Sequence, residues 1–154
     1  MERDKILVLD FGSQYAHLIA KRFRMMGFYS EIELPSVEIS SLKNVKGIVL
    51  SGGPASVYDE NIPDFNKEIL KLDIPILGLC YGHQLMATSY GGKVEKASVG
   101  EFGIASLTKN EEGKKSPLLE GVAEETQVWM SHQDSVSTIG QGFTVIASTK
   151  DCKF

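Results

Sequence analysis

The stretch Ile74-Pro-Ile-Leu-Gly-Leu-Cys80-Tyr-Gly-His-Gln84 runs from an apolar segment into a helical pattern through a cysteine with a glycine two positions away on each side. The run Ile74–Leu79 is typical of a strand that is covered on both faces of a parallel sheet. A helical pattern from Gly82 to Tyr90 follows it and stops at a pair of glycines. The G-x-C-x-G pattern therefore predicts a nucleophile elbow, the sharp strand-to-helix turn of many hydrolases, with cysteine in the place of serine.

Apolar and amphipathic segments alternate upstream of this turn. Three short apolar runs predict strands at residues 6–10, 47–50 and 74–79, and a further strand is expected at residues 29–34, where Ile32 and Leu34 alternate with glutamates. Two amphipathic patterns predict helices, at residues 15–26, which Gly27 ends, and at residues 62–72, which Pro63 begins. Alternation of strands and helices predicts an α/β fold, an open and mostly parallel sheet flanked by helices.

The pattern changes after the second predicted helix stop at Gly91-Gly92. Shorter strands are expected there with no long helix between them, at residues 93–96, 103–109, 127–131 and 143–149. These segments predict extra antiparallel strands in the C-terminal half of the chain. The charged segment Glu111–Lys115 is expected to be a solvated loop.

Length and composition limit the class of protein. The 154 residues predict one domain over 1–154, and a formal net charge of −4 argues against nucleic-acid and anionic-membrane partners. We expect no membrane span, no signal peptide and a cytoplasmic protein without a disulfide framework, since there are only two cysteines. We also expect no metal site, and no phosphate-binding loop, because Ser51-Gly-Gly-Pro54 lacks the lysine of that motif.

The predicted elbow explains how Cys80 could react. A thiol at a helix N-terminus lies near unpaired amide groups, which favour its charged thiolate form. The N–H group of Tyr81 would point at an oxyanion formed during attack, and a second donor is expected from Gly52-Gly53-Pro54. The competing interpretation is an inert core cysteine. Cys152 has no comparable context.

The three histidines differ as candidates for a general base. His17 is expected on the surface of the first helix, and His83 lies on the helix after Cys80, with its ring expected to turn away from the thiol. His132 follows a predicted strand in Ser131-His-Gln-Asp134 and could reach a site from a loop. Ordinary turn chemistry explains this His–Asp pair equally well.

Several collinear motifs carry a resemblance to a known family. They are Asp10-Phe-Gly-Ser-Gln-Tyr15, Leu50-Ser-Gly-Gly-Pro54, the Cys80 elbow, Glu101-Phe-Gly103 and Val128-Trp-Met-Ser-His-Gln-Asp134. Together they resemble the class I glutamine amidotransferases with a flavodoxin-like sheet, and in particular the glutaminase domains of GMP synthetases.

The resemblance implies a reaction and a set of roles. The Cys80 thiolate would attack the side-chain amide of glutamine, and the N–H groups of Gly53 and Tyr81 would hold the oxyanion. Gln84 would help to hold the substrate. Three further residues would bind its α-amino and α-carboxylate ends: Ser131, His132 and Asp134. Ammonia would pass to a synthetase domain or subunit that aminates xanthosine monophosphate. ATP and Mg²⁺ would belong to that part, with no cofactor in this chain, and the full-length protein would be a homodimer.

The resemblance also implies a His-Pro-Glu motif that supplies the base and its orienting carboxylate. No His-x-Glu follows Val136 in the 154 residues. We therefore expect a domain that is incomplete at its C-terminus and, alone, has little glutaminase activity. One alternative is a non-catalytic module that binds glutamine or regulates a partner. Another is a different elbow-cysteine hydrolase, such as a gamma-glutamyl peptidase.

Overall fold

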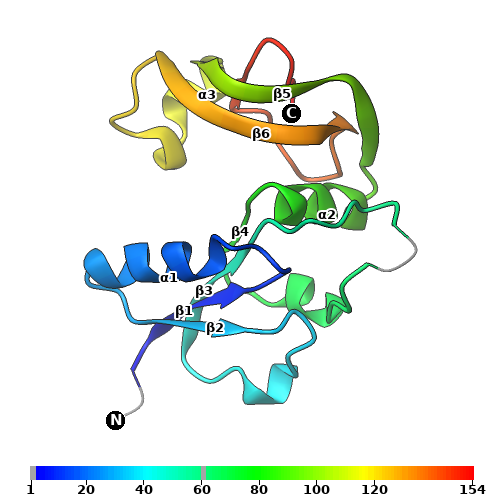
Figure 1. Ribbon diagram of the computed structural model, residues 1–154. Coiled ribbons are helices and arrows are strands. Elements are labelled where there is room, and N and C mark those ends of the chain that lie inside the picture. The colour runs from blue at the N-terminus through cyan, green and yellow to red at the C-terminus, as the bar shows by residue number, and fades with distance from the viewer. Residues whose placement is uncertain (1–2, 60–61) are drawn as a thin grey trace. The chain divides into compact units, whose positions relative to one another are not determined.

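The computed structural model describes residues 3–59 and 62–154, and at residues 97–99 it describes the backbone alone. The chain divides into two compact units, Met1–Leu85 and Met86–Phe154. Each unit has its own sheet (Figure 1). In the described part of the chain, no helix has the length and apolar character needed to cross a bilayer.

The first unit is built on a four-stranded parallel sheet with the order β2-β1-β3-β4. Its strands are β1 (Lys5–Leu9), β2 (Ser30–Glu33), β3 (Val45–Leu50) and β4 (Ile76–Gly78). In the register of the sheet, Val8 lies between Ile32 of β2 and Val49 of β3. All four strands overlap predicted strands, so the prediction of a mostly parallel α/β sheet is confirmed for this unit.

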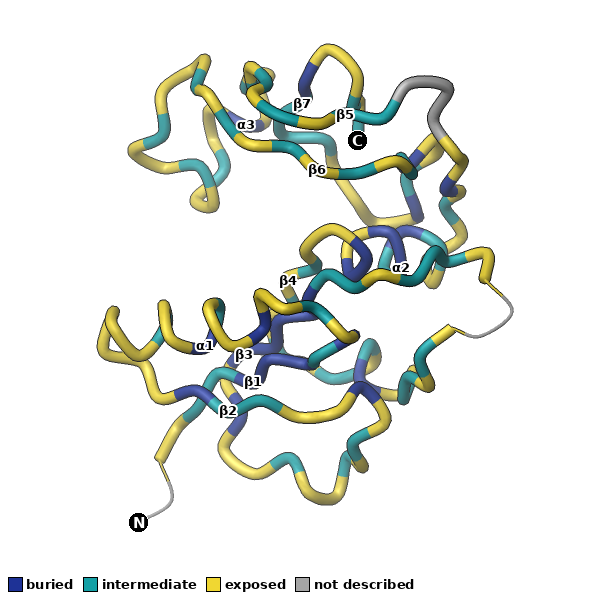
Figure 2. The backbone as a smooth tube through the Cα atoms, in the orientation of Figure 1, coloured by how far each residue is buried: buried dark blue, intermediate teal, exposed yellow. Residues whose placement is uncertain are grey.

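The central strands form the core of the first unit. Figure 2 shows β1 and β3 as its most buried segments, and Val8 and Val49 are at most 2% exposed. The helix α1 (Ala16–Met25) packs Ala16 and Ala20 against these two valines, since small side chains allow helix and sheet to approach closely. The helix ends before Gly27, which adopts a φ of 90°, as its predicted role as a helix stop requires.

The predicted helix at residues 62–72 is wrong. Residues 62–72 are all described, and they contain only the 3₁₀-helix η2 (Lys67–Lys71). An earlier 3₁₀-helix, η1 (Ile39–Ser41), follows β2. Asn66 explains the late start. Its amide groups donate to the carbonyls of Pro35 and Val37, and its side-chain oxygen accepts from the Glu68 N–H at 3.2 Å. These contacts hold Asn66 as an extended N-cap and leave few residues for a helix after it.

The second unit is an antiparallel sheet of the long strands β5 (Lys93–Lys109) and β6 (Glu125–Thr138) with the short β7 (Ala147–Ser148) beside β5. Antiparallel pairing in the C-terminal half was predicted and is confirmed. The predicted break between residues 96 and 103 is wrong. The strand β5 joins the strands expected at residues 93–96 and 103–109 through an irregularity between Lys96 and Glu101.

The segment Glu111–Lys115 is the one-turn helix α3 and not the expected loop; η3 (Pro117–Leu119) follows it. Asn110 caps α3, because its side-chain oxygen accepts from the Gly113 N–H at 2.8 Å. Lys114 pairs with Glu111 at 2.9 Å and with Glu124 at 2.8 Å. The hydrogen bond to Glu124 is the main cause that raises the pKa of Lys114 and lowers that of Glu124.

Candidate active site

Cys80 occupies the junction between β4 and α2 (Tyr81–Ser89), as predicted. Its backbone has a φ of 51°, and Asn44 is the other described residue besides glycines with a positive φ. The side chain of Cys80 is exposed. The Leu79 N–H donates to the Leu50 carbonyl at 2.9 Å, and the Gln84 N–H donates to the Cys80 carbonyl at 3.1 Å as the helix begins. The strained elbow is therefore confirmed, and it presents the thiol outward.

The two flanking glycines allow the strand and the helix to meet. A Cβ atom on Gly78 would lie 2.7 Å from the carbonyl oxygen of Gly82. A Cβ atom on Gly82 would collide with the carbonyl of Leu50, at the end of β3. Both contacts are with backbone, which cannot move aside as a flexible side chain could. The spacing of glycine on each side of Cys80 thus follows from steric need.

The Gly52-Gly53 turn follows β3, the parallel neighbour of β4, and lies beside Cys80. A Cβ atom on Gly52 would be 4.0 Å from Cys80 Sγ. Ser51, which is fully buried, holds this turn in place. Its hydroxyl accepts a hydrogen bond from the Phe11 N–H at 3.1 Å and donates one to the Gly52 carbonyl at 2.8 Å. The structure therefore brings the predicted diglycine turn to the thiol.

The backbone amides around the elbow differ in their hydrogen bonding. The Gly82 N–H is engaged, because it donates to the carbonyls of Ser51 and Leu79. Within the residues that the structure describes, the N–H groups of Tyr81 and Gly53 donate no hydrogen bond. These are the two donors that were predicted for the oxyanion.

Tyr81 and Gln84 are both buried residues of α2. The Tyr81 ring is 2% exposed and lies 5.2 Å, between ring centroids, from Phe11. Burial is the main cause that raises the pKa of the Tyr81 hydroxyl, with a further contribution from the charge of Asp59. Gln84 is 7% exposed. The first turn of α2 is thereby anchored in the first unit.

The predicted substrate residues Ser131, His132 and Asp134 lie in the second unit, within β6. They were expected on a loop, and that expectation is wrong. The pairing of β5 with β6 continues past them, with Glu101 directly opposite His132 and Lys96 opposite Asp134. Ser131 is exposed, whereas His132 and Asp134 are partly buried.

Both ring nitrogens of His132 have partners. Nε2 lies 3.2 Å from Glu101 Oε2, and Nδ1 lies 3.1 Å from the carbonyl oxygen of Asp134. The same Glu101 oxygen accepts from the Thr149 hydroxyl at 3.1 Å, and that hydroxyl accepts from the Cys152 N–H at 3.0 Å. This network joins β5, β6 and the turn after β7. Of the other histidines, His17 and His83 are exposed on α1 and α2, which confirms the expectation for His17.

Cys152 belongs to the same cluster. One ligand atom from each of Glu101, His132 and Cys152 lies within 4.8 Å of the other two. Burial, and then the charge of Glu101, raise the pKa of the Cys152 thiol. The sequence analysis missed this cluster, because its members are far apart in the chain and only the pairing of β5 with β6 brings them together.

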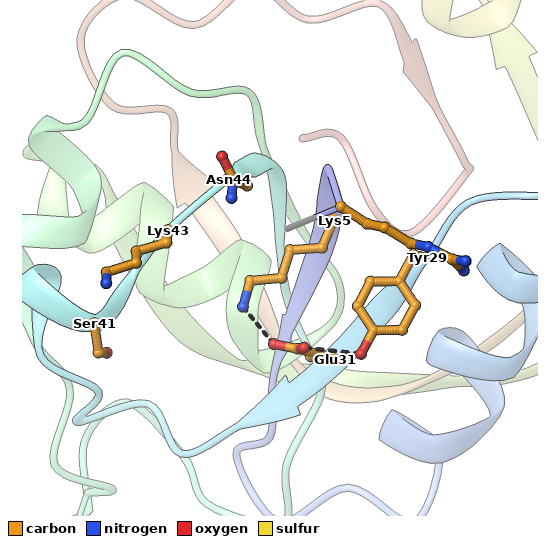
Figure 3. Close-up of a pocket in the computed structure, with 7 residues that line it drawn as sticks. Lys5, Tyr29, Glu31, Ser41, Lys43 and Asn44 are labelled. Carbon is orange, nitrogen blue, oxygen red and sulfur yellow. Dashed lines mark hydrogen bonds and ion pairs between the residues drawn. The ribbon is translucent and has the colours of Figure 1, made fainter. Parts of the chain in front are cut away.

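A separate pocket of about 490 Å³ lies in the first unit at the amino ends of the strands (Figure 3). Lys5 and Glu31 form an ion pair there, and the Tyr29 hydroxyl donates to Glu31 at 2.9 Å. The hydrogen bond from Lys5 is the main cause that lowers the pKa of Glu31. Ligands of open α/β sheets bind at the carboxyl ends of the strands, where Cys80 lies, so this pocket is not the candidate active site.

In a comparison with known proteins, a protein-family model matches nearly the whole chain. The model described as glutamine amidotransferase class-I matches residues 7–154. Among curated relatives, a protein named GMP synthase [glutamine-hydrolyzing] from Lactobacillus delbrueckii is 51% identical over 151 residues, and one of the same name from Clostridium novyi is 49% identical over 155 residues. These matches cover 97% and 99% of this chain but 29% and 30% of the relatives, so the chain spans less than a third of their length.

Solved structures share the fold. A crystal structure of a protein from Thermoplasma acidophilum, described as one subunit of a GMP synthase, matches with a TM-score of 0.84 and 29% identity, over 99% of this chain and 76% of that one. A glutamine amidotransferase from Thermotoga maritima matches with a TM-score of 0.76 at 20% identity, over 99% and 70% of the two chains. The second likeness concerns the fold alone.

Proposed function

This chain belongs to the class-I glutamine amidotransferase family, and on that premise we propose that it hydrolyses the side-chain amide of glutamine with Cys80 as the nucleophile. The observation that carries the proposal is the conformation of Cys80, which has a φ of 51° and an exposed side chain at the start of α2. A residue that is held in a strained conformation at a strand-to-helix turn is typical of a nucleophile in this class of fold.

The reaction has two stages. The Cys80 thiolate adds to the carbonyl carbon of the glutamine side chain, and the tetrahedral intermediate expels its nitrogen, which takes up a proton and leaves as ammonia. A glutamyl thioester remains on Cys80. Water then adds to the thioester, and the products are glutamate and the free thiol. The amidotransferase family uses the ammonia from the first stage.

The negative charge that develops on the carbonyl oxygen needs donors. We assign this role to the N–H groups of Tyr81 and Gly53, which make no other hydrogen bond among the described residues. The contacts that hold the Gly52-Gly53 turn rigid, through the Ser51 hydroxyl, would keep the Gly53 amide in place before substrate arrives. A donor that is fixed in advance costs no reorganisation during the reaction.

The substrate contacts expected of Gln84, Ser131 and Asp134 stay predictions. Because both nitrogens of the His132 ring are engaged, we propose that His132 acts by positioning its strand rather than by binding glutamine directly. We also propose that these 154 residues hydrolyse glutamine slowly by themselves. The His-Pro-Glu motif that the resemblance implies as base and orienting carboxylate is not among them.

We further propose that the ammonia serves the synthesis of GMP, in a synthetase part that is fused to this chain or forms a separate polypeptide. The support is the name and length of the relatives, of which this chain covers 29%. ATP and Mg²⁺ would act in the synthetase part, because the Ser51-Gly-Gly-Pro54 turn has no lysine for a nucleotide phosphate. Glutamine labelled with ¹⁵N at the amide tests the transfer. In a mixture of this protein, a synthetase part, ATP and xanthosine monophosphate, the label should appear in GMP.

Trapping the thioester tests the chemical proposal. The protein is mixed with glutamine, quenched in acid and analysed by mass spectrometry after proteolysis. We expect a glutamyl adduct on the peptide that contains Cys80, no adduct in Cys80→Ser, and none with asparagine, which is one methylene shorter. Glutamine that binds and raises the thermal midpoint without forming an adduct would instead favour the non-catalytic binding module.

A further inference from the structure

A second set of reactive side chains lies in the second unit, on three different segments. Glu101 comes from β5, His132 from β6 and Cys152 from the turn after β7. The carboxylate, the imidazole and the thiol each place one ligand atom within 4.8 Å of the other two. The side chains of His132 and Glu101 are only 13% and 10% exposed.

The chemistry of this set matches a metal ion. A thiolate, an imidazole and a carboxylate are the ligands that zinc binds in proteins, and hard cations such as Mg²⁺ do not use thiolates. We propose that Glu101, His132 and Cys152 form a three-ligand site for Zn²⁺ or a similar divalent cation, with water in the fourth position. This site shares no residue with the proposed nucleophile Cys80 and the proposed oxyanion donors Tyr81 and Gly53.

The geometry requires only small movements. Tetrahedral zinc, with bonds of about 2.0–2.3 Å, holds its ligand atoms roughly 3.3–3.8 Å from one another. The 3.2 Å between His132 Nε2 and Glu101 Oε2 is already close to that separation. The Cys152 thiol now donates to the Phe154 carbonyl at 3.1 Å. On binding, the thiol would leave that carbonyl, lose its proton to solvent and bind the metal as a thiolate.

The rest of the cluster would act as support. The His132 Nδ1 atom, which lies 3.1 Å from the Asp134 carbonyl, would donate to it and leave Nε2 free for the cation. The Thr149 hydroxyl donates to the same Glu101 carboxylate. A backbone carbonyl behind a ligating histidine and a hydroxyl behind a ligating carboxylate are typical supports of a metal site. A bound cation would therefore fix β5, β6 and the Thr149–Cys152 turn to one another.

Cobalt titration of Cys80→Ser tests the site, because Cys152 is then the one thiol left of the two in the sequence. We expect one equivalent of Co²⁺ to produce a thiolate-to-cobalt absorption band in the near ultraviolet and intense visible bands typical of tetrahedral cobalt. Zn²⁺ should abolish these bands by displacing the cobalt. No glutamine chemistry is possible in this variant, so failure here is independent of failure of the proposed function.

Ligand variants in the same background complete the test. Cys152→Ser should remove the thiolate band, and Glu101→Gln should weaken binding by at least about tenfold. Glu112→Gln, at an exposed position of α3, is the matched control and should leave metal binding unchanged. If a ligand variant fails to fold, the Cys80→Ser protein tests the site by itself. Zn²⁺ should raise its thermal midpoint of unfolding, and a chelator should reverse that rise. A folded Cys80→Ser protein with no thiolate band at stoichiometric Co²⁺, or binding unchanged by Glu101→Gln, would overturn the proposal.

Discussion

Gly52 lies directly against Cys80, so that a Cβ atom on Gly52 would be 3.4 Å from the Cβ atom of Cys80 and 4.0 Å from its sulfur. The two residues belong to different turns, one after β3 and one after β4. Parallel pairing of these strands places both turns at the same edge of the sheet. The thiol and the backbone that would hold the oxyanion are therefore positioned by the central sheet of the first unit.

Alanine at the two adjacent glycines should have different effects. A Cβ atom on Gly53 would lie 2.5 Å from the Phe11 carbonyl oxygen, so Gly53→Ala should destabilise the fold by about 1–3 kcal/mol. The contacts at Gly52 are ordinary van der Waals contacts, so Gly52→Ala should fold normally. Its added Cβ atom would lie 4.0 Å from Cys80 Sγ, and alkylation of Cys80 should therefore slow by about tenfold or more. Urea unfolding and alkylation rates measure the two effects. Equal loss of stability in both variants would contradict the assigned contacts.

The Cys80→Gly variant should be more stable than the Cys80→Ala variant. The φ of 51° at Cys80 is a conformation that costs side-chain-bearing residues about 1–2 kcal/mol and glycine little. The unfolded chain has more entropy with glycine than with alanine, which offsets part of this difference. The free energy of unfolding of Cys80→Gly should therefore exceed that of Cys80→Ala by about 0.5–1 kcal/mol. The unfolding free energies of the two variants measure this. A less stable Cys80→Gly would mean that the elbow is not strained.

Removal of the Ser51 hydroxyl should weaken the core of the elbow. Ser51→Ala leaves the Phe11 N–H and the Gly52 carbonyl without their partner in a fully buried site, which should cost about 1–3 kcal/mol. Ser106→Ala is a suitable control, since its hydroxyl bonds to Glu125 on an exposed strand face. We expect a change below about 0.5 kcal/mol in the control. Similar losses in both variants would show that Ser51 does not support the turn.

The Lys5–Glu31 pair should contribute stability that depends on pH. Because the pKa of Glu31 is lowered in the folded state, its contribution is present above the unfolded value of 4.5 and is lost as the pH falls through the lower folded value. Glu31→Gln should therefore cost up to about 1 kcal/mol at pH 7, as expected for a partly exposed pair, and almost nothing in strong acid. Urea unfolding at both pH values measures this. A cost that is the same at both would contradict the assignment.

Much of the first unit could be predicted because its signals are local. The apolar runs of β1, β3 and β4 and the spacing of glycines around Cys80 are visible in short windows of sequence. The helix predicted at residues 62–72 failed because the hydrogen bonds of Asn66 reach back to Pro35 and Val37, about 30 residues earlier, and a periodicity argument cannot see them.

The second unit was predicted less well for the same reason. The strand β5 runs through the irregularity between Lys96 and Glu101 because β6 pairs with it on both sides of that point. This partner also draws Ser131–Asp134 into a strand, where the sequence favoured a loop. The Glu101–His132–Cys152 cluster joins residues that no local pattern connects, since Glu101 and His132 alone are 31 positions apart.

The most direct test of the account is labelling with a glutamine analogue that carries a diazoketone in place of the amide. We expect this electrophile to modify the folded protein once, at Cys80, and glutamine to protect it, while Cys152 stays unmodified. Modification of Cys152 at the same rate, or no modification of Cys80 in folded protein, would contradict the claim that the elbow presents a reactive thiol to a glutamine side chain.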